Sequence, residues 1–199
     1  MFILGLTGSL GMGKSTTAGF FAEAGVPVHD ADAVVHRLYE GEAVTAIEAA
    51  FPGSTAAGKV DRNKLAARVL DDPEALRRLE AIVHPLVRAA EARFLGDAQA
   101  RGAPVVLLDI PLLFETASDQ RVDAIVVVSA PSDTQRRRVL ERPGMTAEKF
   151  DALLARQLPD SEKRRRADFL VDTSRGFDTA RAQVREILRA VATMPKRRR

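Results

Sequence analysis

Five short, mostly apolar runs recur along the chain, and they lack the polar alternation of half-exposed strands. They cover residues 2–6, 26–30, 105–109, 124–128 and 169–172. Continuous Val, Ile and Leu runs are typical of strands buried on both faces of a parallel sheet. Because helical patterns separate the runs, the order of elements is that of an α/β protein. The sequence therefore predicts a five-stranded parallel sheet with helices on both faces.

Helical patterns follow the first run and close the chain. A helix is expected over residues 14–24, and Gly25 stands at the C-cap position that ends it. A second helix is expected over residues 179–192. Between residues 30 and 105 the chain is long and mostly helical. A crossover between parallel strands needs only about a dozen residues, so residues 33–102 are predicted to be a helical insertion.

Polar and glycine residues divide this insertion. Asp61 and Asp72 are candidate N-caps, since each stands just before a helical pattern. Gly53 and Gly58 indicate loops. The insertion is therefore expected to be a set of helices joined by loops.

The composition excludes several classes of protein. With 46% apolar and 29% charged residues in 199, the chain has the profile of an ordinary globular protein. The absence of cysteine excludes disulfides, thiolate metal sites and a thiol nucleophile. No apolar run approaches the roughly 20 residues that span a bilayer, and the first run is too short for a signal-peptide core. We expect a cytoplasmic protein with no membrane partner.

The basic charge is concentrated at the end of the chain. The net charge is +3, and the four basic residues 196–199 supply +4, which leaves −1 for residues 1–195. We interpret residues 194–199 as a solvated basic tail, with weak attraction to nucleic acid as the alternative. No tryptophan and a single tyrosine leave little surface for base stacking. We therefore expect no nucleic-acid partner, and a monomer or weak homo-oligomer.

The turn after the first run carries the clearest chemical signal. Residues 8–15 read Gly-Ser-Leu-Gly-Met-Gly-Lys-Ser and match G-x-x-x-x-G-K-[ST] between a predicted strand and helix. Glycines let backbone amides wrap around phosphate, Lys14 reaches the β- and γ-phosphates, and the Ser15 hydroxyl can ligate Mg²⁺. A dinucleotide site is excluded because Thr16 occupies the third glycine position. The motif predicts a P-loop NTPase core that binds ATP and Mg²⁺ through Gly11, Met12, Gly13, Lys14, Ser15 and Thr16.

A small kinase fits this loop better than other P-loop proteins. A GTPase needs Asn-Lys-x-Asp, but the only asparagine, Asn63, begins Asn-Lys-Leu-Ala. Residues 132–166 are helical in pattern and carry ten Lys or Arg against six Asp or Glu. Arginines on a closing flap can neutralise the transferring phosphoryl group, so we interpret this segment as a helical lid. A solvated helix pair with i,i+4 ion pairs is the alternative.

Three carboxylates are candidates for the chemistry. Asp30 and Asp32 end the second run, where open α/β sheets gather their ligands. One of them can accept the proton of an acceptor hydroxyl while the other holds a backbone turn; a plain N-cap is the structural alternative for Asp32. Asp109 ends a buried strand like a Walker-B metal ligand, or it fixes the turn at Pro111. The isolated His36 is interpreted as structural.

Together these residues resemble one family, the dephospho-coenzyme A kinases. Residues 5–16 are similar to its GLTGGIGSGKST, and residues 30–36 to its D-A-D-x-x-x-H. Residues 111–115 match P-L-L-F-E. Further landmarks follow in the expected order: Asp61-Arg62, His84-Pro85, Gln135, Arg138, Arg142, Gln157, Lys163 and Ala167-Asp168.

The resemblance implies transfer of the ATP γ-phosphoryl group to the ribose 3′-hydroxyl of dephospho-coenzyme A, the last step of coenzyme A synthesis. It implies Asp32 as base or hydroxyl-orienting group, Thr7 beside it, and Lys14 and Arg142 on the phosphates. Ser15 and Asp109 would hold the metal. The implied organisation is a nucleotide-binding core (residues 1–32, 103–131 and 167–193), an acceptor-binding insertion (33–102) and a lid (132–166).

Four positions depart from the family pattern. Ser9 and Met12 replace small loop residues, which is tolerable if their side chains point away from the phosphates. Pro143 follows Arg142 where the family often has Asp, and Thr173 stands where it usually has Asn, near the expected adenine contact. Two other functions stay open: another small-molecule kinase acting on a nucleoside or nucleotide, and a nucleotide-dependent binding switch that uses the tail on nucleic acid.

Overall fold

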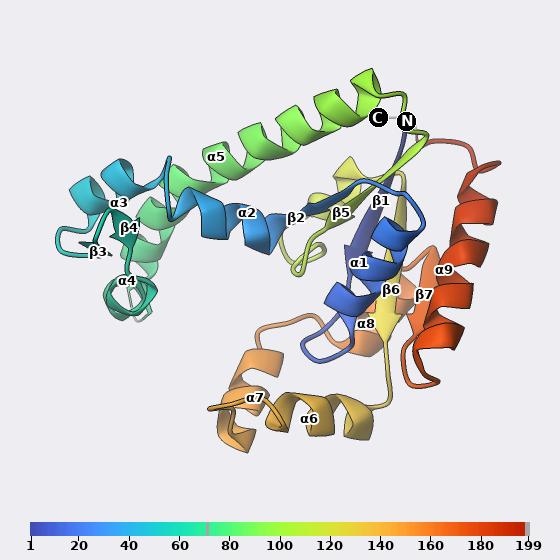
Figure 1. The fold of residues 1–199 in the computed structure, drawn as a ribbon. Coiled ribbons are helices and arrows are strands. Elements are labelled where there is room, and N and C mark those ends of the chain that lie inside the picture. Colours follow the sequence, from blue (N-terminus) through green and yellow to red (C-terminus); the bar gives the residue numbers. More distant parts are fainter. Residues whose placement is uncertain (71, 198–199) are drawn as a thin grey trace. The chain divides into compact units, whose positions relative to one another are not determined.

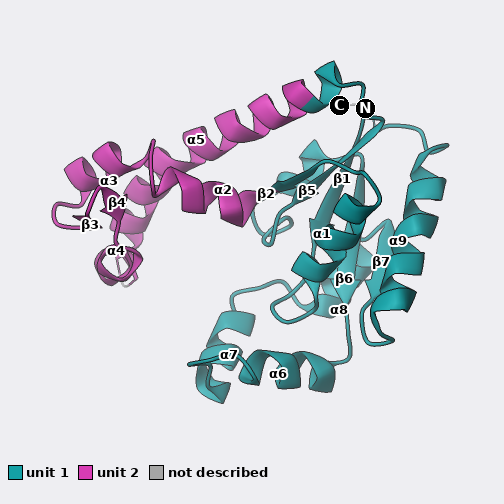
Figure 2. Cartoon of the chain, in the orientation of Figure 1, with its two compact units in different colours: residues 1–29, 98–199 teal, residues 30–97 magenta. Residues whose placement is uncertain are grey.

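The computed structural model describes residues 1–70 and 72–197. The chain forms two compact units, residues 1–29 with 98–199 (unit 1) and residues 30–97 (unit 2), coloured separately in Figure 2. Unit 2 covers most of the predicted insertion, residues 33–102, but it begins three residues earlier, at Asp30. The last two residues of the predicted basic tail lie outside the described residues.

Unit 1 is built on a five-stranded sheet with the order β2-β5-β1-β6-β7. β1 pairs in parallel with both β5 and β6, and β6 pairs in parallel with β7. Leu107 N donates to Pro27 O at 2.9 Å beside the edge strand β2. The strands are β1 Phe2–Thr7, β2 Val28–Asp30, β5 Val105–Asp109, β6 Ala124–Ser129 and β7 Phe169–Asp172. The predicted sheet is confirmed: each predicted run overlaps one of these strands, and β1 and β6 each extend one residue beyond their runs.

Helices cover both faces of this sheet, as predicted (Figure 1). Alternate strand residues pack with buried side chains of α1 and α9 in one core. On the opposite face, Ser129 Oγ donates to Asp160 Oδ2 of α8 at 2.7 Å. The helices of unit 1 are α1 Lys14–Glu23, η1 Ser118–Arg121 (a 3₁₀ turn), α6 Ser132–Leu140, α7 Ala147–Leu154, α8 Asp160–Arg165 and α9 Phe177–Val191.

Unit 2 has its own apolar core, formed by side chains such as Leu38, Ile47 and Leu79. Asp61 and Asp72 are N-caps, as predicted: each Oδ1 accepts two backbone amides at the start of the following helix. The elements are α2 Ala31–Leu38, α3 Val44–Ala50, β3 Thr55–Ala56, β4 Lys59–Val60, α4 Arg62–Val69 and the greater part of α5 Pro73–Ala100.

The hairpin of β3 and β4 was not predicted, because Gly53 and Gly58 were interpreted as marking loops. Its two strands have two residues each and pair in antiparallel fashion. The turn places Ala57 at φ 50° and Gly58 at φ 75°. Such turns normally use Asn-Gly or Asp-Gly, so Ala-Gly gave little signal for a hairpin.

The carboxyl ends of β1, β5 and β6 lie at one edge of the sheet. Register pairs Leu6 with Asp109 and Thr7 with Val127. Chemistry-bearing residues that follow these strands are therefore brought together, as is usual in open α/β sheets. Across the described ranges, no helix has the length and apolar character needed to cross a membrane.

Candidate active site

The nucleotide loop, residues 8–13, connects β1 to α1. Gly11 and Gly13 have φ of 80° and 91°, a region that a side chain disfavours. α1 begins at Lys14, and among the described residues no side chain caps its start. The first amides of a helix lack intrahelical partners and carry the positive end of its dipole, so the loop presents a ready anion site.

Lys14 lies at the end of this loop and faces the last residue of β5. Its Nζ is 2.6 Å from Asp109 Oδ1, and the two side chains are 15% and 2% exposed. The sheet register places Asp109 beside Leu6, two residues before Gly8. The structure thus brings together two of the predicted site residues, one basic and one acidic, at the same edge of the sheet.

Thr7 ends β1 and is fully buried. Its Oγ1 donates to Pro111 O at 2.9 Å, which ties β1 to the segment after β5. Glu115, further along that segment, accepts Leu158 N at 2.8 Å and lies 3.0 Å from the buried Lys163 Nζ. The segment after Asp109 is therefore fixed at both ends.

This arrangement shifts the pKa of the Glu115 carboxyl group. Burial alone raises its pKa, but the amides of Leu158 and of Glu115 itself and the Lys163 ammonium favour the charged form more strongly. The net result is a pKa below the ordinary value. Glu115 is accordingly a carboxylate that anchors the chain rather than a proton acceptor.

Ser9 and Met12 both point into the protein, as expected for side chains that leave the phosphate region free. They are 2% exposed. Met12 Sδ accepts Ala130 N at 3.1 Å. Thr173, where the resemblance placed an adenine contact, instead donates from Oγ1 to Met12 O at 2.8 Å.

The proposed metal ligand Ser15 and its neighbour Thr16 are exposed in the first turn of α1. Over the described ranges, no three His, Cys, Asp or Glu side chains are grouped so that they could hold a metal ion by themselves. This donor set suits Mg²⁺, which is usually bound by few protein ligands together with substrate phosphates and water.

The segment predicted as a lid consists of α6, α7 and α8 within unit 1. Arg136 joins the first two helices: it pairs with Asp151 at 3.0 Å and lies over the Phe150 ring at 5.6 Å. Arg142, predicted to reach the phosphates, is exposed in the turn just after α6. Its role stays a prediction.

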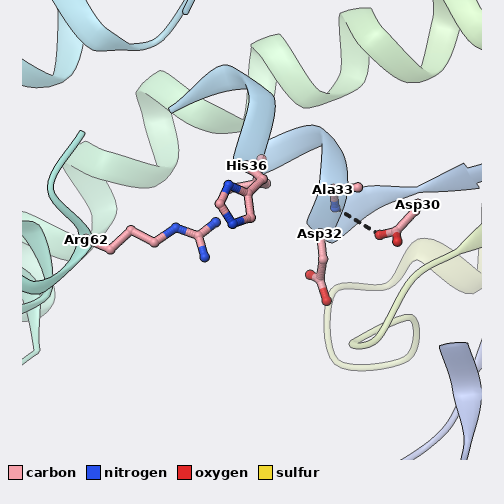
Figure 3. A pocket seen from close by; sticks show the side chains of 6 residues that line it. Asp30, Asp32, Ala33, His36 and Arg62 are labelled. Carbon is pink, nitrogen blue, oxygen red and sulfur yellow. Dashed lines mark hydrogen bonds between the residues drawn. The ribbon is translucent and has the colours of Figure 1, made fainter. Parts of the chain in front are cut away.

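Asp32 lies in unit 2, in the first turn of α2. Asp30, not Asp32, is the N-cap of this helix: its Oδ1 accepts Ala33 N at 2.9 Å. Both carboxylates are exposed, and Asp30 holds a backbone turn. A pocket of about 450 Å³ lies here, lined by Asp30, Asp32, Ala33, Val35, His36 and Arg62 (Figure 3).

Two polar residues of this pocket were not singled out as functional from the sequence. His36 was interpreted as structural, yet it is exposed and four residues after Asp32, so both lie on one helix face. Figure 3 shows the Arg62 guanidinium pointing toward His36. The i,i+4 spacing was a usable signal for His36. Arg62 was named only within the family landmark Asp61-Arg62, and its place in the pocket could not be predicted because only the tertiary fold brings the start of α4 to α2.

The parallel sheet and the loop between β1 and α1 place the chain in the class of P-loop kinases. A family model for dephospho-CoA kinase matches residues 2–196. Two curated dephospho-CoA kinases from strains of Rhodopseudomonas palustris are 66% and 64% identical over 198 residues, 100% of this chain and of each relative. A crystal structure of a Thermus thermophilus protein superposes with a TM-score of 0.85 at 37% identity, covering 97% of this chain and 98% of that one. The chain belongs to the dephospho-CoA kinase family.

Proposed function

We propose that this chain transfers the γ-phosphoryl group of ATP to the ribose 3′-hydroxyl of dephospho-coenzyme A, giving coenzyme A and ADP. The observation that carries the proposal is full-length membership of the family, with relatives 66% and 64% identical. The loop of residues 8–13 and the Lys14–Asp109 pair support the donor half of the reaction.

The nucleotide would be bound by unit 1. The amides of Gly11, Met12 and Gly13 and of the first turn of α1, Thr16 included, would hold the phosphates. Lys14 would move its charge onto the β- and γ-phosphates. When bound, Mg²⁺ would neutralise phosphate charge, with Ser15 as its protein ligand and Asp109 acting on it directly or through water.

The acceptor would be bound by unit 2, in agreement with residues 33–102 as an acceptor-binding insertion. Asp32 would accept the proton of the 3′-hydroxyl as its oxygen forms a bond to the γ-phosphorus. The bond from that phosphorus to the β–γ bridging oxygen breaks at the same stage, and ADP leaves. Thr7 would keep the end of β1 in place, and Arg142 would approach the phosphates from the lid, residues 132–166.

The other segments of the chain also have proposed roles. Residues 1–32, 103–131 and 167–193 would form the nucleotide-binding core, of which residues 30–32 lie at the start of unit 2, with 194–199 as a tail that has no part in catalysis. We further propose a cytoplasmic monomer or weak homo-oligomer that needs neither nucleic acid nor membrane.

The test is ADP release from Mg-ATP with dephospho-coenzyme A, AMP, adenosine or shikimate as the acceptor. Strong stimulation by dephospho-coenzyme A alone, with the new phosphate mapped to the 3′ position, is the expected result. Stimulation by another acceptor would keep the kinase class and overturn the acceptor. Absence of stimulation by all four would favour a nucleotide-dependent switch.

A further inference from the structure

Helix α6 packs against the nucleotide loop, on the side toward which backbone carbonyl groups of the loop point. Gln135 of α6 is 4% exposed, and its Nε2 donates to Leu10 O at 2.7 Å. The contact is close: a Cβ added to Gly11 would lie 2.4 Å from Val139 Cγ2. One face of α6 is therefore a fixed support for the first half of the loop.

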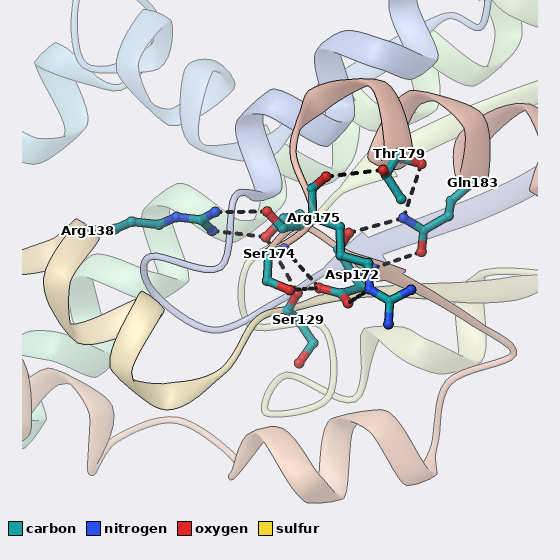
Figure 4. Close-up of polar contacts among 8 residues, drawn as sticks. Ser129, Arg138, Asp172, Ser174, Arg175, Thr179 and Gln183 are labelled. Atoms are coloured by element: carbon teal, nitrogen blue, oxygen red, sulfur yellow. Dashed lines mark hydrogen bonds and ion pairs between the residues drawn. The ribbon is translucent and has the colours of Figure 1, made fainter.

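A second contact from the same helix reaches the loop through Thr173. Arg138, three residues after Gln135, donates from Nη1 to Thr173 Oγ1 at 2.9 Å and from Nη2 to Thr173 O at 2.8 Å. Thr173 Oγ1 in turn lies 2.8 Å from Met12 O. Figure 4 shows the Arg138 guanidinium directed at the segment that follows β7.

Thr173 is itself held in a rigid turn. The neighbouring Asp172 accepts Ser174 N at 2.8 Å, and its own amide donates to Gln183 Oε1 at 3.0 Å. Gln183 Nε2 donates back to Asp172 O at 3.0 Å (Figure 4). The Thr173 hydroxyl therefore contacts the nucleotide loop from a backbone segment that is itself held by hydrogen bonds.

The chemistry of the two side chains sets the direction of these hydrogen bonds. A guanidinium group has only donors, so the Thr173 oxygen must accept from Arg138. The single hydroxyl proton is then left for a carbonyl, and Met12 O at 2.8 Å is nearer than Ser129 O at 3.5 Å. Arg138 therefore directs the Thr173 hydroxyl proton toward Met12 O.

Holding a carbonyl also orients an amide. In a trans peptide the C=O and N–H groups point in opposite directions. Since Leu10 O and Met12 O are held toward Gln135 and Thr173, the amides of Gly11 and Gly13 are turned the other way. These are amides that a P-loop uses to bind phosphate oxygens.

We propose that Arg138 and Thr173 form a positioning relay that fixes the peptide between Met12 and Gly13 for phosphate binding, with Gln135 doing the same for the peptide after Leu10. Arg138 is a positioning residue that acts through Thr173, not a group that touches the nucleotide. The inference deepens the proposed function by assigning how its donor site is held, and rests on it only for the identity of the nucleotide.

The relay is tested by Thr173→Val, which keeps the shape of the side chain and removes the hydroxyl, by Arg138→Leu, and by the double variant. Affinity for Mg-ATP is measured by calorimetry without acceptor, followed by kcat and both KM values. Each single variant should bind ATP about tenfold more weakly, the scale of one hydrogen bond with a charged partner. The double variant should be no weaker than either, and the acceptor KM should not change.

Three controls separate the relay from other roles. Thr173→Ser keeps the hydroxyl and should restore ATP affinity. Arg136→Leu removes a cation from the same helix that pairs with Asp151 instead, and it should bind ATP as the unaltered chain does. Thermal unfolding of every variant checks that the fold persists.

Two results would overturn the relay. Unchanged ATP affinity in Thr173→Val would show that the hydroxyl does not hold the loop. Fully additive losses in the double variant would show that Arg138 acts on the nucleotide by itself. Because ATP binding is measured without acceptor, a failure of the dephospho-coenzyme A assignment leaves this experiment interpretable.

Discussion

The nucleotide loop and the unit 2 pocket are held in different ways. The loop is fixed by partners far away in sequence: Leu10 N donates to Gln157 Oε1, Leu10 O accepts from Gln135, and Met12 O accepts from Thr173. In the pocket, the hydrogen bond of Asp30 to Ala33 is local, and Asp32 and His36 are exposed. We infer that the proposed donor site is organised before binding, whereas the exposed side chains of the pocket would be ordered on binding the proposed acceptor, at an entropic cost.

The largest effect is expected in the pocket. Asp32→Asn removes the proposed proton acceptor and keeps the side-chain shape, so kcat should fall about 10²–10⁴-fold. ATP affinity should be unchanged, since Asp32 belongs to unit 2. Steady-state kinetics and calorimetry measure both.

Asp72→Asn is the matched control for that variant. It makes the same change of charge at the N-cap of α5, and asparagine caps as well as aspartate does. Its kcat should equal that of the unaltered chain. Near-normal turnover in Asp32→Asn would refute the assignment of the base.

A somewhat smaller loss is expected in the loop. Lys14→Ala removes the cation that the proposal moves onto the phosphates, and kcat/KM for ATP should fall about 10²–10³-fold. The affinity for dephospho-coenzyme A should be retained. If the acceptor affinity fell as strongly as the ATP affinity, the division between the two regions would be contradicted.

The same difference explains which features of the fold and of the site could be predicted from the sequence. Parallel strands buried on both faces are continuous apolar runs, and the loop motif is contiguous, so the sheet and the residues from Gly8 to Ser15 were predictable. Gly25, at φ 84°, ends α1 as predicted. The start of α9 was placed two residues too late, since Phe177 rather than Thr179 is its first residue. These are local features of the chain.

Features that depend on tertiary contacts could not be predicted from the sequence. The partnership of Arg138 with Thr173 joins residues 35 apart, and the place of Arg62 in the pocket depends on the packing of α4. The pairing of Lys14 with Asp109 joins residues 95 apart. Sequence reasoning named Lys14 and Asp109 separately, as phosphate and metal ligands, but did not predict their contact.

A third prediction concerns the contribution of the Glu115–Lys163 ion pair to the free energy of unfolding. Glu115→Gln removes the charge that faces the buried Lys163, so the free energy of unfolding at pH 7 should fall by about 1–3 kcal/mol. The folded pKa of Glu115 lies below its ordinary value of 4.5. Its stabilisation is therefore complete above that value and is lost as the pH falls through the folded pKa.

Urea unfolding between pH 7 and pH 3 measures this effect. The variant should differ most from the unaltered chain at neutral pH, and the difference should shrink in acid. Glu162→Gln, which removes an exposed partner of Arg165 on α8, is the control and should change stability by less than about 1 kcal/mol. A difference that stayed constant with pH would contradict the charged role of Glu115.

The smallest effect is expected at the tail. Deleting residues 195–199 removes the exposed Arg197–Asp168 ion pair, and such pairs contribute little. kcat and both KM values should change less than about twofold. A nucleotide-dependent switch would instead lose affinity for nucleic acid and the salt dependence of that affinity. Kinetics and a salt titration with duplex DNA and single-stranded RNA distinguish these outcomes.

The most direct test of the division between the two regions is a crossed titration. Mg-ATP and dephospho-coenzyme A are each titrated by calorimetry into Lys14→Ala and Arg62→Gln, one variant from each region. We predict that Lys14→Ala loses affinity for ATP and keeps the acceptor, while Arg62→Gln loses the acceptor and keeps ATP. If both variants lost the same ligand, or each lost both, the assignment of donor and acceptor to separate units would be wrong.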